Sequence, residues 1–115
     1  MNILVLEAEP AARYVHVDSE NLVVDLADGR SLAIPIDWYP RLRCATEAER
    51  RNWYLLGDGY AIEWPDLDEH IGVEGLLAGR PSGESERSLT RWLQSRKAQF
   101  PAAGVASTEY PASTL

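Results

Sequence analysis

The chain has 115 residues, which suits one domain, and its apolar content of 45% is ordinary for a globular protein. Its formal net charge of −7 argues against general affinity for nucleic acid or anionic membrane, because both require a cationic surface. The single cysteine, Cys44, cannot form an internal disulfide, which suits a reducing compartment. Residues 1–7 lack the basic stretch and the long apolar run of a signal sequence or membrane span, so we expect a cytoplasmic protein.

The first third of the chain predicts an antiparallel meander. Residues 2–6 form an apolar run that favours a strand, and three further segments favour β-structure and are separated by turn residues: 14–17, 22–26 and 31–36. Asp28-Gly29 predicts a hairpin turn, because glycine accepts a positive φ without steric cost. Pro35 cannot donate to a ladder and places its strand at an edge or at its end.

Short helices are predicted next. Residues 37–42 favour a helical turn. Thr46 and Glu49 have the spacing of a capping box, which predicts a helix that runs to about Tyr54 and is ended by residues 57–59. The side chains expected to face inward are those of Ala45, Trp53 and Leu56.

The next segment predicts one more strand pair and a helical turn. Residues 60–64 favour a strand with Tyr60, Ile62 and Trp64 on one face. The remaining segments are predicted as a turn, a short strand and a single helical turn closed by Gly79, over residues 66–70, 71–73 and 73–79 respectively.

These elements predict an α+β fold, a small antiparallel meander with short helices packed on it, over residues 1–80. A linker leads to a C-terminal helical extension over residues 81–97, capped by Ser85 or Ser82. Its apolar stripe has i, i+3, i+4 spacing and consists of Leu89, Trp92 and Leu93. Residues 98–115 are predicted to be a disordered tail, because they are rich in small residues and proline without periodicity.

Several motifs occur together and in order: Asp28-Gly29-Arg30, residues 35–42, Ala45-Thr46 with Glu49-Arg50, Gly59 with residues 62–69, and residues 75–79. Over roughly residues 10–80 this series resembles the bacterial family called domain of unknown function 2442, and residues 81–97 look like the helical extension of some members. The resemblance implies a small α+β fold. Some relatives are fused to a helix-turn-helix domain, and others are encoded beside small proteins in an arrangement like a toxin–antitoxin pair. The family has no established catalytic residues to carry over, and one helix after residue 80 is too little for a helix-turn-helix domain.

Two sets of residues have side chains of the types that bind metals or catalyse reactions. Asp66, Asp68, Glu69 and His70 are divalent-ion ligands by type, but their spacing does not match a calcium loop, so a turn whose carboxylates cap backbone amides is favoured. Cys44 with His16 or His70 would suit a Cys/His hydrolase, but nothing in the sequence brings a histidine to the cysteine. We therefore predict no enzyme, no metal and no cofactor.

Charge and aromatic residues point instead to binding. Residues 55–79 hold six carboxylates and no Lys or Arg, whereas residues 84–97 hold four basic against two acidic residues. An acidic face suits docking to a basic partner. The tryptophans at 38, 53 and 64 are interpreted as core, and Tyr39, Arg41 and Arg43 are predicted to lie at the surface, since tyrosine and arginine are frequent in binding hot spots.

The sequence thus predicts a non-catalytic protein-interaction module, antitoxin-like or regulatory, that partners a small basic protein, with exchange of the last helix in a homodimer left open. The predicted partner-binding residues are Tyr39, Arg41, Arg43, Asp66, Asp68, Glu69, Leu89, Trp92 and Leu93. One alternative is a nucleic-acid-associated transcriptional regulator that uses Tyr39 and the arginines at 41, 43, 50 and 51. The other is a small metal-dependent or Cys/His hydrolase.

Overall fold

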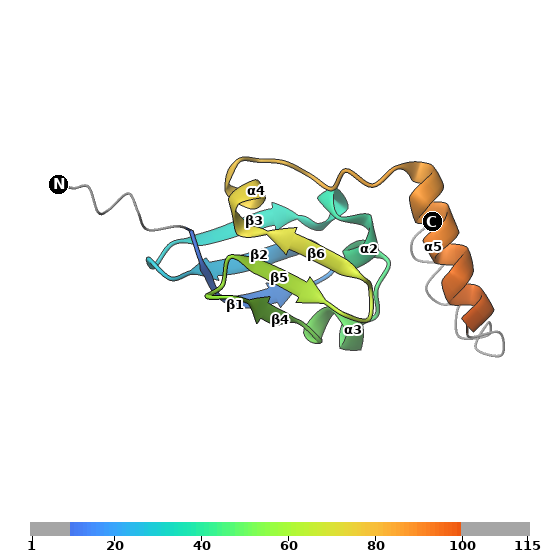
Figure 1. The fold of residues 1–115 in the computed structure, drawn as a ribbon, viewed down its shortest axis with the longest axis horizontal. Helices are drawn as coiled ribbons and strands as arrows, with labels where there is room; N and C mark the ends of the chain where they lie inside the picture. The colour runs from blue at the N-terminus through green and yellow to red at the C-terminus, as the bar shows by residue number, and fades with distance from the viewer. Residues whose placement is uncertain (1–9, 100–115) are drawn as a thin grey trace. The chain divides into compact units, whose positions relative to one another are not determined.

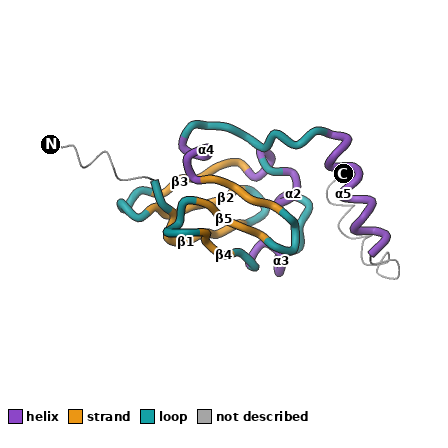
Figure 2. Tube along the Cα trace, viewed as in Figure 1, coloured by secondary structure: helices purple, strands orange, loops and turns teal. Residues whose placement is uncertain are grey.

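The computed structural model describes residues 10–99 (Figures 1 and 2). Its elements in chain order are β1 (Ala12–Val17), β2 (Asn21–Leu26), β3 (Ser31–Pro35), the 3-10 helix η1 (Ile36–Trp38), α2 (Pro40–Arg43), α3 (Glu47–Arg51), β4 (Tyr54–Leu56), β5 (Ala61–Trp64), β6 (Glu69–Gly72), α4 (Val73–Leu77) and α5 (Glu86–Gln99). The chain divides between Pro81 and Ser82 into two compact units. Within the described part, no helix is long and apolar enough to cross a membrane.

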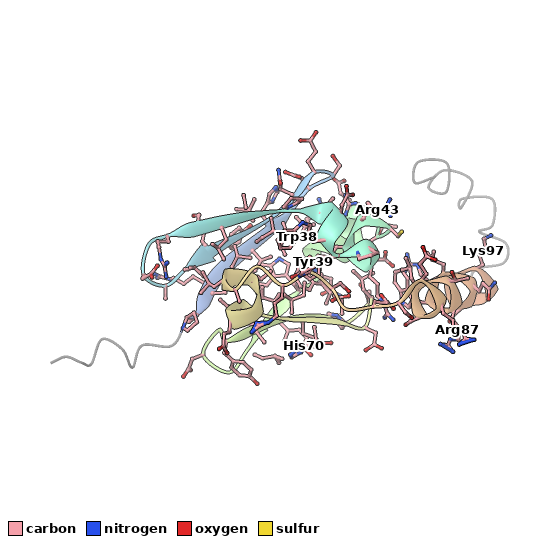
Figure 3. The ribbon with its side chains drawn as sticks, turned by 90° about the horizontal axis from the view of Figure 1, so that it is seen from above. Trp38, Tyr39, Arg43, His70, Arg87 and Lys97 are labelled. Atoms are coloured by element: carbon pink, nitrogen blue, oxygen red, sulfur yellow. The ribbon has the colours of Figure 1, made fainter. Side chains whose placement is uncertain are left out.

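The first unit contains two antiparallel three-stranded sheets, ordered β1-β2-β3 and β4-β5-β6. The α+β prediction is therefore confirmed, with two small meanders in place of one. Figure 3 shows the sheets as two layers with side chains between them. The core holds fully buried residues from both sheets and from α2, such as Leu22, Val24, Leu42, Ile62 and Trp64. Among residues 10–97, whose burial the structure describes, no polar or charged residue is buried, so apolar burial provides the main stabilisation.

Hydrogen bonds between residues close together in the chain close the turns of the first sheet. Asp18 Oδ1 accepts hydrogen bonds from the backbone N–H groups of Glu20 and Asn21, at 2.8 and 2.7 Å, and closes the β1–β2 turn. The β2–β3 turn is closed in the same way around Asp28, and Gly29 in it has φ 98°. A register shift between Ala12 and Tyr14 lets both Ala12 and Val15 face the core, although they are three positions apart in the strand. The predicted turns and the end of edge strand β3 at Pro35 are confirmed.

The predicted capping box is also confirmed. Thr46 Oγ1 accepts from the backbone N–H of Glu49 at 3.1 Å, and the Glu49 carboxylate accepts from that of Thr46 at 2.9 Å. The predicted length of the helix was wrong, because α3 ends at Arg51. Residues 54–56 instead pair with residues 61–63 as a β-hairpin, and residues 57–60 form its turn.

Two further predictions in this region are corrected. Glu69 and His70 lie in β6 and not in a turn, since they pair with Trp64 and Glu63 of β5. Tyr60 does not face inward with Ile62 and Trp64; it is 55% exposed. The helical turn closed by Gly79 is confirmed as α4, and Gly79 has φ 77°.

The second unit contains α5. Ser85 Oγ accepts from the backbone N–H of Ser88 at 3.1 Å, which confirms Ser85 as the cap. The Ser88 hydroxyl donates to Glu84 at 2.7 Å. The helix continues to Gln99, slightly beyond the predicted end. The predicted strand over residues 2–6 and the tail from residue 100 lie outside the described residues.

Candidate functional site

The outer face of the second sheet is the candidate site. The β4–β5 register places Tyr54 opposite Glu63, and the β5–β6 register places Glu63 opposite His70, so the three side chains form one cross-strand row. Tyr54 is 49% exposed, and the His70 and Glu63 side chains are 55% and 21% exposed. His70 Nδ1 lies 3.2 Å from Glu63 Oε1. Leu56, two residues after Tyr54 on the same strand, is half-buried on this face. These four residues are called the outer face below.

Strand periodicity explains the placement. The neighbouring row, Leu55–Ile62–Ile71, points to the opposite side of the sheet, where Ile62 is fully buried and Ile71 nearly so. Because successive side chains alternate across a strand, burial of this row forces the row of Tyr54, Glu63 and His70 outward. His70 is labelled in Figure 3, on β6.

The Cys/His pair considered from the sequence is not assembled in this row. The row offers a phenol, a carboxylate and an imidazole, but no thiol. Cys44 lies instead at the end of α2, and His16 lies in the first sheet, with Nε2 3.9 Å from Asp18 Oδ2. Within residues 10–99, no group of three His, Cys, Asp or Glu residues is arranged to hold a metal ion.

Tyr39 does not lie at the surface, so that prediction was wrong. Its side chain is only 4% exposed, and its hydroxyl donates to the Arg80 carbonyl at 2.9 Å. Burial raises the pKa of Tyr39, and the nearby charge of Glu69 adds to the effect. Tyr39 joins the segment after α4 to the core, where Figure 3 shows it next to Trp38.

Arg41 likewise has a mainly structural position. Its side chain is 14% exposed, and Nη1 donates to the carbonyls of Leu67 and Asp68, at 2.9 and 3.2 Å. It therefore fixes the β5–β6 turn. Arg43 is 38% exposed, with Nε 3.5 Å from Asp37 Oδ1, and stays partly at the surface as predicted.

The other two arginines of the nucleic-acid alternative are also engaged. Arg50 donates to the carbonyls of Leu42 and Arg43, both at 2.9 Å, and burial lowers its pKa. Arg51 lies 3.9 Å from Glu47 one helical turn away. Arginines that hold backbone carbonyls are not available to stack on bases, and this weakens the nucleic-acid alternative.

The acidic residues do not form one continuous face. Asp58 lies in the β4–β5 turn and Asp66 and Asp68 lie in the β5–β6 turn, at opposite ends of β5. Asp66 accepts a hydrogen bond from the side chain of Asn52 at 3.0 Å, whereas Asp68 is 94% exposed. Glu69 is half-buried in β6. The acidic face predicted for residues 55–79 was therefore wrong as a single surface, because a hairpin sends consecutive turns to opposite ends of its sheet.

The tryptophans largely follow the core prediction. Trp64 is fully buried and its Nε1 donates to the Arg50 carbonyl at 3.2 Å. Trp38 and Trp53 are half-buried, and the Trp53 and Tyr14 rings pack nearly perpendicular to each other with their centroids 5.5 Å apart. In α5, the predicted stripe of Leu89, Trp92 and Leu93 is half-buried, and the Arg96 guanidinium lies 4.6 Å from the Trp92 ring.

Sequence reasoning missed Tyr54 as a surface residue, because it assigned residue 54 to the end of a helix. The available signal was the series of two β-favouring segments, 53–56 and 60–64, around a turn with two glycines. The His70–Glu63 pair followed only from the register of the hairpin.

The outer face belongs to a region shared with other proteins. The chain is similar to the crystal structure of a protein of unknown function from Rhodospirillum rubrum, with 30% identity and a TM-score of 0.59, over 67% of this chain and 95% of that one. It is also similar to the solution structure of an uncharacterized protein from Chromobacterium violaceum, with 25% identity and a TM-score of 0.55, over 70% and 74% of the two chains. No curated protein matches. The family model described as "Protein of unknown function (DUF2442)" matches residues 12–82, and the chain therefore belongs to this family.

Proposed function

We propose that the protein is a non-catalytic protein-interaction module of the bacterial cytoplasm, an antitoxin-like or regulatory partner of a small basic protein. The observation that carries the proposal is the outer face of the second sheet. It displays Tyr54 and His70 on either side of Glu63, while the other side of the same strands is buried.

The chemistry of this face suits a basic protein segment. Tyrosine provides a large contact area at low conformational cost and is frequent in hot spots. Glu63 offers carboxylate oxygens to a lysine or arginine. Across residues 10–81 there are thirteen carboxylates against seven arginines, so the whole unit attracts cations toward the face.

The exposed carboxylates at the two ends of β5 extend this attraction. Asp68 at one end and Asp58 at the other are both exposed, with the outer face between them. They contribute to the rate of encounter more than to the strength of the final contact, because exposed charge pairs are screened by salt.

The test is an affinity purification of the full chain from its native host, in parallel with the variants Tyr54→Ser and Tyr14→Ser. Tyr14 is a matched control, since it is 56% exposed and lies in the first sheet. We expect a stoichiometric protein of high isoelectric point with the wild type and with Tyr14→Ser, and its loss with Tyr54→Ser. The partner is then identified by mass spectrometry and the complex is rebuilt from two purified proteins.

A rebuilt complex that weakens as salt is raised, and about tenfold or more with Tyr54→Ser, supports the proposal. A partner that binds both tyrosine variants equally contradicts it. Nucleic acid in place of protein, released by nuclease, would instead support the regulator alternative. Circular dichroism of each variant checks that the fold is retained.

A further inference from the structure

We propose that the outer face receives helix α5 of a second copy, so that two chains exchange their C-terminal helices. The inference goes beyond the proposed function, because it places a second copy on the face where the basic partner would otherwise bind. Three observations carry it: the composition of α5, the opposite charges of α5 and of residues 10–81, and the dimensions of the face.

Helix α5 has the form of a docking segment. Ser85 caps its first turn, and Leu89, Trp92 and Leu93 lie on one side at i, i+3, i+4 spacing. All three retain exposed area. A helix of 14 residues is marginal by itself in water, so packing of this stripe is expected to stabilise it.

The charges of α5 and of residues 10–81 are complementary. Over Glu86–Gln99, four basic residues stand against one carboxylate, whereas residues 10–81 have a net charge of −6. Arg87 and Lys97, both labelled in Figure 3, are exposed. A basic helix of a second copy is therefore attracted to the carboxylates around the outer face.

The dimensions also agree. Two strand spacings of about 4.8 Å make the three-stranded face about 10 Å wide, which is close to the diameter of one helix with its side chains, about 10 Å. Leu89 and Leu93 would pack against Tyr54 and Leu56, with basic side chains of the helix beside Glu63. About a two-fold axis the same contact forms twice, which doubles the area that one short stripe buries.

The experiment measures the mass of the full chain by sedimentation equilibrium, for the wild type and for Tyr54→Asp, Leu93→Asp and Tyr14→Asp. We expect a dimer for the wild type and for Tyr14→Asp. Each of the other two variants should be monomeric or should raise the dimer dissociation constant about tenfold or more.

Mixing the two defective variants is the decisive step. The Tyr54→Asp chain keeps an intact helix and the Leu93→Asp chain keeps an intact face, so together they can form one of the two contacts. We expect the mixture to yield a heterodimer that neither variant forms alone. Dimers built face to face or helix to helix would not be restored by mixing.

A monomeric wild type, a dimer that survives both variants, or a mixture that stays monomeric overturns the inference. If circular dichroism shows that an aspartate variant is unfolded, Tyr54→Ser and Leu89→Ser replace the pair. A monomeric wild type whose basic partner still depends on Tyr54 would remove the exchange and leave the proposed function standing. If mixing restores a heterodimer and no basic partner is found in the host, the exchange is supported and the proposed function is contradicted.

Discussion

The two sheets of the first unit are held by different kinds of contact. The turns of the first sheet are closed by Asp18 and Asp28, whose partners lie two or three residues away. The β5–β6 turn of the second sheet is held by Arg41 and Asn52, through contacts that span 26 and 14 residues. The first sheet is therefore specified locally, and the second depends on tertiary structure.

This difference accounts for where sequence reasoning succeeded. A turn closed by a nearby aspartate can be predicted from adjacent residues, and all the predicted turns of the first sheet are present. In the second sheet, the row of Tyr54, Glu63 and His70 points outward, and no local sequence pattern predicts this row. Four substitutions test the comparison, in order of decreasing expected effect.

Removal of the largest fully buried side chain should have the greatest effect. Trp64 is fully buried in the central strand of the second sheet. Trp64→Ala is expected to lower the free energy of unfolding by about 3–5 kcal/mol, because it leaves a cavity. Denaturant titration measures the loss. Tyr14→Ala, at an exposed ring in the first sheet, should cost far less, and equal losses would show that the second sheet is not central to the core.

Gly29 and Gly59 have the same φ of 98°. Alanine substitutions at these two positions therefore distinguish the cost of backbone strain from the cost of a steric clash with a neighbouring strand. A Cβ on Gly59 would collide with the backbone carbonyl oxygen of Ala12, whereas a Cβ on Gly29 meets nothing within 4 Å. Both alanine variants carry the left-handed penalty of about 1–2 kcal/mol. Gly59→Ala should cost about 1–3 kcal/mol more, because the backbones must separate. Similar thermal melting shifts for the two variants would mean that Ala12 moves away without cost.

Arg41 tests the long-range contact itself. Arg41→Met keeps the stem but removes the donor to the carbonyls of Leu67 and Asp68, and it should cost about 1–3 kcal/mol. Arg51→Met is the control, since Arg51 is 71% exposed and its pairing with Glu47 is worth about 0.5 kcal/mol or less. Chemical unfolding of both variants gives the comparison, and an equal cost would argue that the β5–β6 turn holds without Arg41.

The smallest effect concerns the local turn and depends on pH. Hydrogen bonds from the backbone N–H groups of Asn21 and Glu20 lower the pKa of Asp18 below 3.8. Because the folded pKa is the lower one, the charged form stabilises the protein above pH 3.8, and this contribution is lost as the pH falls through the folded pKa. The wild type should therefore be slightly more stable than Asp18→Asn at neutral pH, with the difference shrinking in acid. Melting temperatures of both proteins, measured from neutral to acidic pH, test this expectation. A difference in melting temperature that does not change with pH would contradict it.

Local sequence is enough to predict the α+β class, the turns at Asp18 and Asp28, the capping box at Thr46 and the cap of α5 at Ser85. These depend on residues within a few positions of one another. Tertiary structure alone decided that residues 54–56 leave the helix for a hairpin, that Tyr39 is buried, and that Arg41 holds a distant turn. It also brought Tyr54, Glu63 and His70 into one row. Strand register and side-chain burial depend on which distant part of the chain covers a strand, and the neighbouring residues do not specify that part.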